Sequence, residues 1–434
     1  MFAPQFLNSK RTEQVMQNNR NRRGLSSNGN QDTLRNMQIH NRKTKVKKKG
    51  AGVLKAFIIV ISILLLAAVA CGAALWVYRP DVDDGPAFDT GEIEFPPVTD
   101  ENGETVDMPG VSAGEYKRKD GVYNFLFIGK DRVAENTDVM MLISFDTESK
   151  DISVLQLPRD TYIEYEGNGR RINYLYASLH SKAIKDGAED SIGVALDDLS
   201  NILERNMCIK IDYHVMIDLE GFAQIVDAIG GVPIDVPYDL KYSDSEQGLY
   251  IDIKKGQQTL DGETAEQFVR FRSGFVEGDI GRVDAQKIFL AAFLRQLKSS
   301  FNIQNIPGLV SSVFGSILHT DISLADMVFF AKEAIGVELE NATFITLPGK
   351  DARANVNSGA WYYIMARADT LAVINKYINV YQVDISDSIF DKAEAFTSDA
   401  EHINEIYKAE AGKYSKDSYT ADEINKNPPE IPLT

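Results

Sequence analysis

An uncharged apolar run from Ala56 to Tyr78 most constrains what this chain can become. Roughly 20 helical residues cross the hydrocarbon core of a bilayer, so the run is long enough to span one. It lacks the polar stripe that a surface helix of a soluble domain shows. Trp76 and Tyr78 stand at its far end, as interfacial aromatic side chains do. We therefore expect a transmembrane helix over residues 56–78.

Charge is divided across that run. Residues 1–55 contain thirteen Lys or Arg and two acidic residues, about +11, whereas the remainder carries 33 basic and 61 acidic residues, about −28. Basic flanks stay in the cytoplasm, so we expect the N-terminus there and the acidic part outside the cell membrane. Residues 1–55 lack hydrophobic periodicity and are predicted to form a disordered tail that suits anionic lipid. The acidic part argues against nucleic acid as a partner.

The two cysteines limit how the outer part is stabilised. Cys71 lies in the apolar run, and Cys208 is the only cysteine beyond it. An intrachain disulfide within the outer domain is therefore excluded, and its fold must rely on a hydrophobic core. The stretch Ala68–Cys71 weakly resembles a lipoprotein processing site, and cleavage there would still leave the domain anchored outside.

The outer part divides into three segments. Residues 79–117 are acidic and rich in Pro and Gly, and we expect an extended stalk. In residues 118–385, β-rich runs mix with amphipathic stretches, which predicts an α/β domain: a three-layer α/β/α sandwich around a central mixed sheet. Residues 386–434 are predicted to be a weakly ordered acidic tail. The expected strands are 123–129, 140–145, 152–157, 213–219, 232–236, 250–253 and 342–347, and the expected helices are 189–206, 220–228, 261–268, 281–297, 307–317, 324–335 and 370–378.

Charged residues flank the first three expected strands. Asp131 follows the first strand and Asp138 precedes the second, while Arg159 and Asp160 follow the third. If the strands form an antiparallel meander, these positions meet at one edge of the sheet. Paired carboxylates are what Mg²⁺ uses while it also holds phosphate oxygens. The competing interpretation is that these are ordinary turn residues, which Arg159 merely bridges.

Further cationic side chains follow in two later segments. Arg270 and Arg272 lie on one face of an extended segment if the preceding helix ends near Phe268. Arg282 and Gln286 share one face of the next helix, whose N-terminal N–H groups favour an anion. Guanidinium groups hold phosphates bidentately, so the set suits a diphosphate. The alternative is a group of surface ion pairs within an acidic domain.

Several stretches, in the same order, resemble motifs of the LytR-CpsA-Psr family of cell-envelope phosphotransferases, across roughly residues 118–380. They are NFLFIGKD (124–131), TDVMML (137–142), LPRDTYIE (157–164), RINYLYA (171–177), DYHVMIDLEGFAQIVDAIGGVPIDVP (212–237), GQQTLDGETAEQFVRFR (256–272) and GDIGRVDAQKIFLAAFL (278–294).

The resemblance implies a Mg²⁺-dependent (or Mn²⁺-dependent) membrane phosphotransferase. Such an enzyme moves a glycopolymer, with its linking phosphate, from a polyprenyl-diphosphate lipid to a peptidoglycan sugar hydroxyl. The polymer is teichoic acid, capsule or another wall polysaccharide, and the lipid tail lies in an apolar tunnel. Asp160 is then a candidate general base, or a residue that orients Arg159. The implied metal ligands are Asp131 and Asp138, and the implied diphosphate-binding residues are Arg159, Arg270, Arg272, Arg282 and Gln286.

Two other functions remain open from the sequence. A hydrolase or pyrophosphatase acting on polyprenyl-diphosphate-linked glycans would use the same site, with water in place of the sugar hydroxyl. A non-catalytic envelope regulator would not need the acids and arginines at all. The chain also departs from the family pattern at Asn136, Thr137, Ala285 and Lys287, where members often carry Arg, Ser, Arg and Gln.

Overall fold

In a computed structural model of the chain, the described residues are 78–83, 98–99, 105–106, 116–130, 137–166, 168–244, 249–271, 279–300, 306–353, 361–391, 393 and 418–428. The basic tail and all of the predicted transmembrane run except Tyr78 lie outside these residues, and so do Asp131 and Arg272. Within the described residues, no helix combines the length and the apolar character that a membrane span requires.

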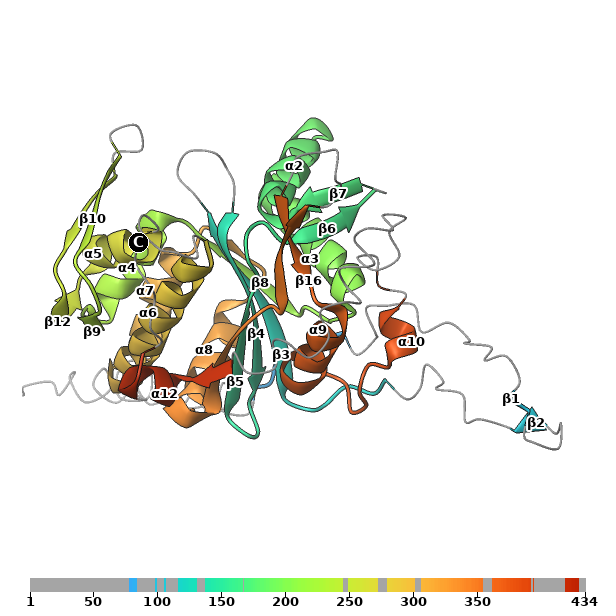
Figure 1. Cartoon of the computed structure of the whole chain (residues 1–434). Coiled ribbons are helices and arrows are strands. Elements are labelled where there is room, and N and C mark those ends of the chain that lie inside the picture. The colour runs from blue at the N-terminus through green and yellow to red at the C-terminus, as the bar shows by residue number, and fades with distance from the viewer. Residues whose placement is uncertain are drawn as a thin grey trace, which may run out of the picture. The chain divides into compact units, whose positions relative to one another are not determined.

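A mixed sheet forms the centre of the domain, and seven of the described strands make it up in the order β13-β8-β3-β4-β5-β14-β17 (Figure 1). Strands β3, β4 and β5 are consecutive and antiparallel, so they form the meander on which the expected meeting of Asp138, Arg159 and Asp160 depends. Strand β8 runs parallel to β3, and β14 runs parallel to β5. The bounds are Val122–Lys130 (β3), Thr137–Asp146 (β4), Asp151–Gln156 (β5), Tyr213–Ile217 (β8), His319–Thr320 (β13), Ala342–Thr346 (β14) and Ser418–Thr420 (β17).

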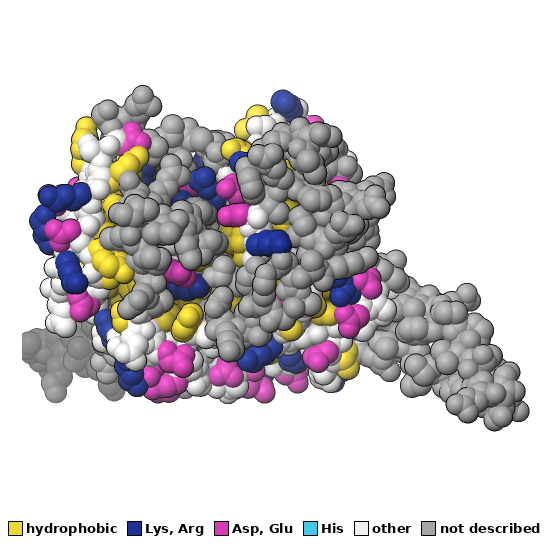
Figure 2. Space-filling view, viewed as in Figure 1, with side chains coloured by type: hydrophobic (Ala, Val, Ile, Leu, Met, Phe, Trp, Pro, Cys, Tyr) yellow, Lys and Arg dark blue, Asp and Glu magenta, His cyan; other side chains and the backbone are white. Residues whose placement is uncertain are grey.

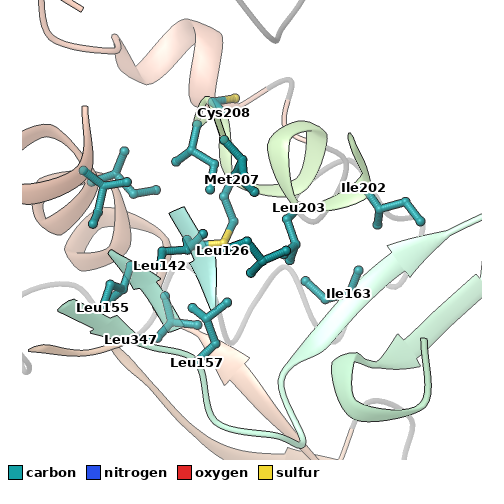
Figure 3. Packing of buried hydrophobic residues seen from close by; sticks show 14 of the residues in the cluster. Leu126, Leu142, Leu155, Leu157, Ile163, Ile202, Leu203, Met207, Cys208 and Leu347 are labelled. Atoms are coloured by element: carbon teal, nitrogen blue, oxygen red, sulfur yellow. The ribbon is translucent and has the colours of Figure 1, made fainter. Parts of the chain in front are cut away.

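Helices cover both faces of this sheet, because alternate residues of its strands point to opposite sides. Leu126 and Leu142 pack into one hydrophobic cluster with Leu203 and other residues of the helices on that side (Figure 3). Phe127 and Met141 pack into a second cluster on the other side. The first face carries α2 (Ile172–Lys185), α3 (Ser191–Met207) and α9 (Arg367–Val373), and the second carries α4 (Leu219–Ala228), α5 (Gly262–Arg270) and α6 (Asp279–Ser300).

The remaining elements are short. Helices α7 (Ile306–Gly315) and α8 (Leu324–Ala334) flank β13, and a π-helix, η3 (Ile374–Ile378), continues α9. Further strands of the described residues pair two by two outside the main sheet. The pairs are β1 (Val98–Thr99) with β2 (Thr105–Val106), β6 (Tyr162–Tyr165) with β7 (Asn168–Arg171), β9 (Val232–Val236) with β12 (Gly256–Leu260), β10 (Leu240–Asp244) with β11 (Leu249–Ile253), and β15 (Gly349–Arg353) with β16 (Trp361–Met365).

Residues 78–83 lie against the domain and do not begin an extended stalk, which differs from the expectation for this segment. The Tyr78 hydroxyl donates to Asp326 Oδ1 in α8 at 2.6 Å. Pro80 is buried, and Val82 packs against an aromatic cluster between α8 and the sheet. Apolar contact thus fixes a segment whose Pro and acidic residues had suggested a solvated stalk.

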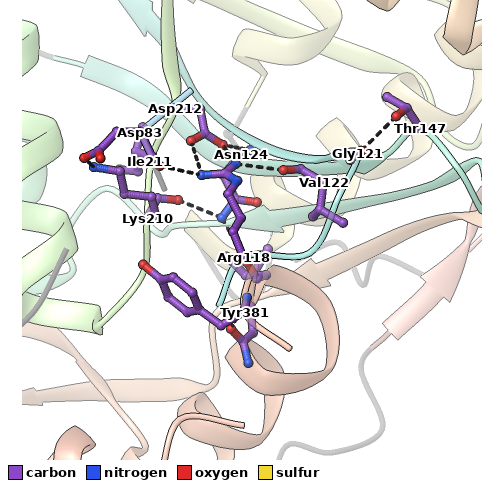
Figure 4. A network of polar contacts seen from close by, with 12 residues as sticks. Asp83, Arg118, Gly121, Val122, Asn124, Thr147, Lys210, Ile211, Asp212 and Tyr381 are labelled. Carbon is purple, nitrogen blue, oxygen red and sulfur yellow. Dashed lines mark hydrogen bonds and ion pairs between the residues drawn. The ribbon is translucent and has the colours of Figure 1, made fainter. Parts of the chain in front are cut away.

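A buried ion pair holds the same end of the sheet together. Arg118 Nη1 and Nη2 donate to the two carboxylate oxygens of Asp212 at 2.7 and 2.5 Å, with side chains 6% and 1% exposed (Figure 4). The same carboxylate accepts the Asn124 backbone N–H at 2.7 Å. Arg118 also donates to the Asp83 carbonyl, and Lys210 pairs with the Asp83 carboxylate at 3.3 Å. The pair therefore ties β3 to β8 and holds the docked N-terminal segment.

The chain returns near its C-terminus to extend the sheet. Strand β17 pairs with β14, and helix α12 (Ala421–Lys426) packs beside α6. Thr420 and Glu423 form a capping box at the start of α12, and Ile424 is buried in the second cluster. Residues 418–428 are thus part of the folded domain, unlike the weakly ordered tail that was expected there.

Candidate functional site

The antiparallel register brings three chain segments to one edge of the sheet. Lys130, the last residue of β3, pairs with Thr137, the first residue of β4. Gln156, the last residue of β5, pairs with Met141 near the same edge. The segments that carry Asp138, Arg159 and Asp160 therefore converge as the meander predicted.

Asp138 lies between two guanidinium groups. Arg159 Nη1 is 3.5 Å from Asp138 Oδ1, and Arg282 Nη1 is 3.8 Å from the same oxygen. Arg282 Nη2 also donates to the Asp138 backbone carbonyl at 3.3 Å. The Arg282 side chain is 5% exposed, whereas Asp138 is 38% exposed. The carboxylate thus faces solvent from a charged pocket floor that α6 supplies.

Gln286 stands one turn after Arg282 on the same face of α6, as their spacing predicted. Its side-chain carbonyl accepts from Gln156 Nε2 at 2.9 Å, and its Nε2 donates to the Val269 carbonyl at 3.3 Å. Gln286 thereby joins the sheet edge to the end of α5. A small cavity at this place is lined by Asp138, Val139, Met140, Gln156, Leu157, Arg159, Arg282, Val283 and Gln286.

Arg270 is the last residue of α5, so the helix ends two residues later than expected. Its guanidinium donates to Glu266, one helical turn earlier, at 2.9 Å. The chain turns extended only at Phe271, and Arg272 lies outside the described residues. The expected extended segment with both arginines on one face therefore does not begin at Val269. Arg270 directly follows Val269 in the sequence, and the Val269 carbonyl accepts a hydrogen bond from Gln286.

Asp160 lies on the other side of Arg159 and brings in an arginine that the charge pattern of the sequence did not single out. Asp160 Oδ1 is 3.9 Å from Arg159 Nε and 3.8 Å from Arg171 Nη1. Arg171 precedes α2, and its guanidinium carbon lies 5.6 Å from the centre of the Tyr362 ring. Its place at the start of the RINYLYA motif is the one sequence signal that could have identified it.

Two residues that depart from the family pattern do not line the small cavity. Ala285 is buried in the second hydrophobic cluster. Lys287 Nζ pairs with Asp284 at 3.0 Å and lies 6.0 Å from the centre of the Tyr419 ring in β17. Ala285 therefore belongs to the hydrophobic core, and Lys287 links α6 to the C-terminal segment.

The carboxylates at this sheet edge supply part of what a hard cation such as Mg²⁺ needs. Within the described ranges, no group of three or more His, Cys, Asp or Glu side chains is arranged to hold a metal ion. Mg²⁺, however, is usually bound by one or two carboxylates together with substrate phosphates. Asp138 provides one such accessible carboxylate, and the other predicted ligand, Asp131, lies outside the described residues.

A second pocket, of about 720 Å³, lies further along α6. Ile288 and Ala292 of α6 contribute apolar walls, whereas Arg295 lies at an exposed position. The other lining residues are Pro233, Ile234, Asp235, Gln257, Gln258, Thr259, Ile424, Asn425, Lys426 and Pro428. On the face of the molecule that Figure 2 displays, Lys and Arg side chains are interspersed with Asp and Glu side chains.

Comparison with known proteins finds relatives that are named as teichoic acid transferases. A polyisoprenyl-teichoic acid–peptidoglycan teichoic acid transferase, TagV of Bacillus subtilis, is 26% identical over 260 residues, which cover 58% of this chain and 63% of that protein. A TagU transferase of the same description from Oceanobacillus iheyensis is 30% identical over 256 residues, 58% of this chain and 73% of that protein. The crystal structure of B. subtilis TagV matches with a TM-score of 0.48 and 24% identity, over 59% of this chain and 95% of that one.

The family assignment rests on a match that spans more than half of the chain. The LytR_cpsA_psr family model matches residues 97–379, which include the charged edge, α6 and most of the sheet. The chain belongs to the LytR_cpsA_psr family.

Proposed function

We propose that this protein transfers a glycopolymer, with its linking phosphate, from a polyprenyl-diphosphate carrier to a sugar hydroxyl of peptidoglycan. The observation that carries the proposal is the position of Arg159 and Arg282 on either side of the accessible Asp138 carboxylate. The relatives' names describe the same transfer for teichoic acid. The polymer in this case is teichoic acid or another wall polysaccharide.

The arginines would act by position and charge. In the reaction, the sugar oxygen bonds to the phosphorus next to the polymer, and the bond to the bridging oxygen breaks. Polyprenyl phosphate leaves with the electron pair, and one proton is released, for which the Asp160 carboxylate is the candidate acceptor. Preorganised guanidinium groups stabilise the charge that develops on the leaving phosphate, so no covalent enzyme intermediate is needed. Arg159 and Arg282 would do this at the edge, and we assign the same role to Arg270, the last residue of α5, and to Arg272.

A divalent cation, Mg²⁺ or Mn²⁺, would supply additional neutralisation of the diphosphate oxygens. Asp138 and Asp131 are the residues that would hold it. The hydrogen bonds of Gln286 to Gln156 and to the Val269 carbonyl keep the wall of the small cavity in place around the cation and the diphosphate.

Helix α6 lines both the small cavity at the charged edge and the larger pocket, to which it contributes apolar side chains. Arg282 and Gln286 line the small cavity, and Ile288 and Ala292 line the larger pocket further along the same helix. From Arg282 to Ala292 the helix rises about 15 Å. We assign the larger pocket to part of the lipid tail, with the diphosphate at the N-terminal end of α6.

The same proposal includes the place of the protein in the cell. Residues 56–78 would span the cell membrane once, with the basic tail in the cytoplasm and the α/β domain outside. The carrier lipid would then reach the site from the outer leaflet of the same membrane.

The test is transfer activity of the full chain in detergent, with a short-prenyl donor and a peptidoglycan fragment as acceptor. Arg270→Ala should abolish transfer while circular dichroism shows an unchanged fold. Arg205→Ala, which removes the same charge from an exposed position on α3, should transfer as well as the native chain. Full transfer by Arg270→Ala would refute the site assignment. Polymer released to water, with none joined to the acceptor, would indicate a hydrolase instead.

A further inference from the structure

The charged edge of the sheet extends beyond Asp138 and Arg159 to the α2 side of the sheet. Arg282 and Gln286 belong to α6, which packs on the face of the second hydrophobic cluster. Arg171 instead precedes α2, which packs on the opposite face in the first cluster. Asp138 and Arg159 lie between the α6 side and the α2 side, because Asp138 contacts Arg282 and Arg159 contacts Asp160.

Basic and acidic side chains alternate along this edge from the α6 side to the α2 side. Arg282 Nη1 lies 3.8 Å from Asp138 Oδ1, which is 3.5 Å from Arg159 Nη1. Asp160 Oδ1 then lies 3.9 Å from Arg159 Nε and 3.8 Å from Arg171 Nη1. All four distances exceed those of ordinary hydrogen bonds, so these pairs attract without fixed donor–acceptor geometry.

Backbone hydrogen bonds hold the segment that carries Arg159 and Asp160. The Asp160 carbonyl accepts the Tyr363 N–H of β16 at 2.8 Å, and Thr161 forms a bridge with the same residue. The Arg159 carbonyl accepts the Asn173 N–H in the first turn of α2 at 3.1 Å. The backbone at Arg159 and Asp160 is therefore held in place without the donor.

We propose that Arg171, together with Asp160, forms the acceptor side of the site and binds the hydroxyl-bearing sugar. This inference rests on the proposed function. Phosphoryl transfer places the attacking and leaving oxygens roughly in line on opposite sides of phosphorus. We assign the lipid-linked leaving phosphate to the α6 side, where Ile288 and Ala292 line the larger pocket, so the attacking hydroxyl approaches from the α2 side. Arg171 positions the Asp160 carboxylate beside that hydroxyl and donates to acceptor oxygens.

The test separates the two substrates by their KM values, with the full chain in detergent. Arg171→Ala should raise the KM for a soluble peptidoglycan fragment roughly tenfold or more, the loss expected for a charge-assisted hydrogen bond. The KM for the short-prenyl donor should stay within about twofold of the native value. Arg171→Lys should recover part of the acceptor affinity, because it restores the charge without the guanidinium fork.

Arg170→Ala is the matched control, since Arg170 is the exposed neighbour on β7 and carries the same charge. It should leave both KM values unchanged. An unchanged acceptor KM in Arg171→Ala, or an equal rise for donor and acceptor, would overturn the inference. If the native chain binds both substrates but transfers nothing, the proposed function fails. Equilibrium binding of the acceptor fragment to Arg171→Ala then still decides whether Arg171 holds the acceptor.

Discussion

Arg159 Nη1 and Asp138 Oδ1 lie 3.5 Å apart at the edge of the sheet, although one residue follows β5 and the other is the second residue of β4. The separation is too long for an ordinary hydrogen bond, and both side chains are partly exposed. Such a pair costs little to rearrange, because exposed ion pairs contribute only about 0–1 kcal/mol. Arg159 and Asp138 can therefore turn toward a ligand without a large loss of stability.

Asp138→Asn should lower transfer by roughly 10²–10³-fold and shift the Mg²⁺ concentration needed for half-maximal activity upward. The amide keeps the shape of the side chain but removes the charge that attracts the cation. A Mg²⁺ titration of the initial transfer rate measures both effects. Asp252→Asn, an exposed acid on β11, is the control and should behave as the native chain. Identical Mg²⁺ curves for Asp138→Asn and the native chain would remove Asp138 from the metal site.

The buried pair of Arg118 and Asp212 yields a stability prediction. Replacing Arg118 by Met should lower the free energy of unfolding by about 3–5 kcal/mol, because the Asp212 carboxylate loses its partner while still buried. Urea unfolding followed by circular dichroism measures the loss. The double variant Arg118→Met with Asp212→Leu should lose less than Arg118→Met alone. Simple additivity of the two single losses would contradict a coupled pair.

Glu204 yields a pH prediction. Burial raises the pKa of Glu204, despite the hydrogen bond from the Ile211 N–H and the nearby Lys210. The folded state therefore keeps the Glu204 proton to higher pH than the unfolded state, and stability falls as pH rises from the unfolded pKa to the folded pKa. Glu204→Gln removes this fall.

The measurement is urea unfolding of Glu204→Gln and of the native chain at a series of pH values from about 4 to 8, which brackets the ordinary pKa of a Glu side chain. The free energy of unfolding of the variant, relative to that of the native chain, should rise with pH and then level off once Glu204 is ionised in both states. A difference that is constant over this range would refute the titration of Glu204.

The contacts of residues 78–83 predict how the domain reaches its lipid substrate. Tyr78 and Val82 are docked at the sheet end opposite Asp138, so about 27 Å of strand separates that end from the site. A long Gly-Ser insertion after Val77 would free the domain from this tether. Transfer from a donor embedded in vesicles should fall, while transfer from a short-prenyl donor in solution should not. If the insertion variant and the native chain transfer from the vesicle donor at equal rates, the docked segment has no positioning role.

Much of the sheet and its charged edge was predictable, because β3, β4 and β5 show apolar runs that turn residues separate. The meander itself then brings Asp138 and Arg159 together. The pairs β6–β7 and β15–β16 were not predicted, since strands such as NGRR carry no apolar alternation and are held by pairing with neighbours. Arg171 was overlooked for this reason, because its proximity to Asp160 depends on the β6–β7 hairpin that precedes α2.

Two boundaries show where tertiary contacts override local pattern. The Pro and acidic residues at 79–83 resemble a solvated linker, yet Pro80 is buried and Val82 packs against the aromatic cluster between α8 and the sheet. Helix α5 continues to Arg270, where the Glu266–Arg270 pair one turn apart supports its last turn. Residues 418–420 were expected to lie in a weakly ordered tail, because β17 depends on pairing with an edge of β14 that only the fold provides.

The most direct test of the diphosphate site is equilibrium binding of a short-chain prenyl diphosphate to the full chain in detergent, measured by calorimetry with Mg²⁺ present. We predict that Arg159→Ala and Arg282→Lys each weaken binding roughly tenfold or more, because each loses a charge-assisted or bidentate contact to phosphate. The exposed-site variant Arg205→Ala should bind as the native chain does. Native affinity in both Arg159→Ala and Arg282→Lys would contradict the assignment of the sheet edge as the diphosphate site.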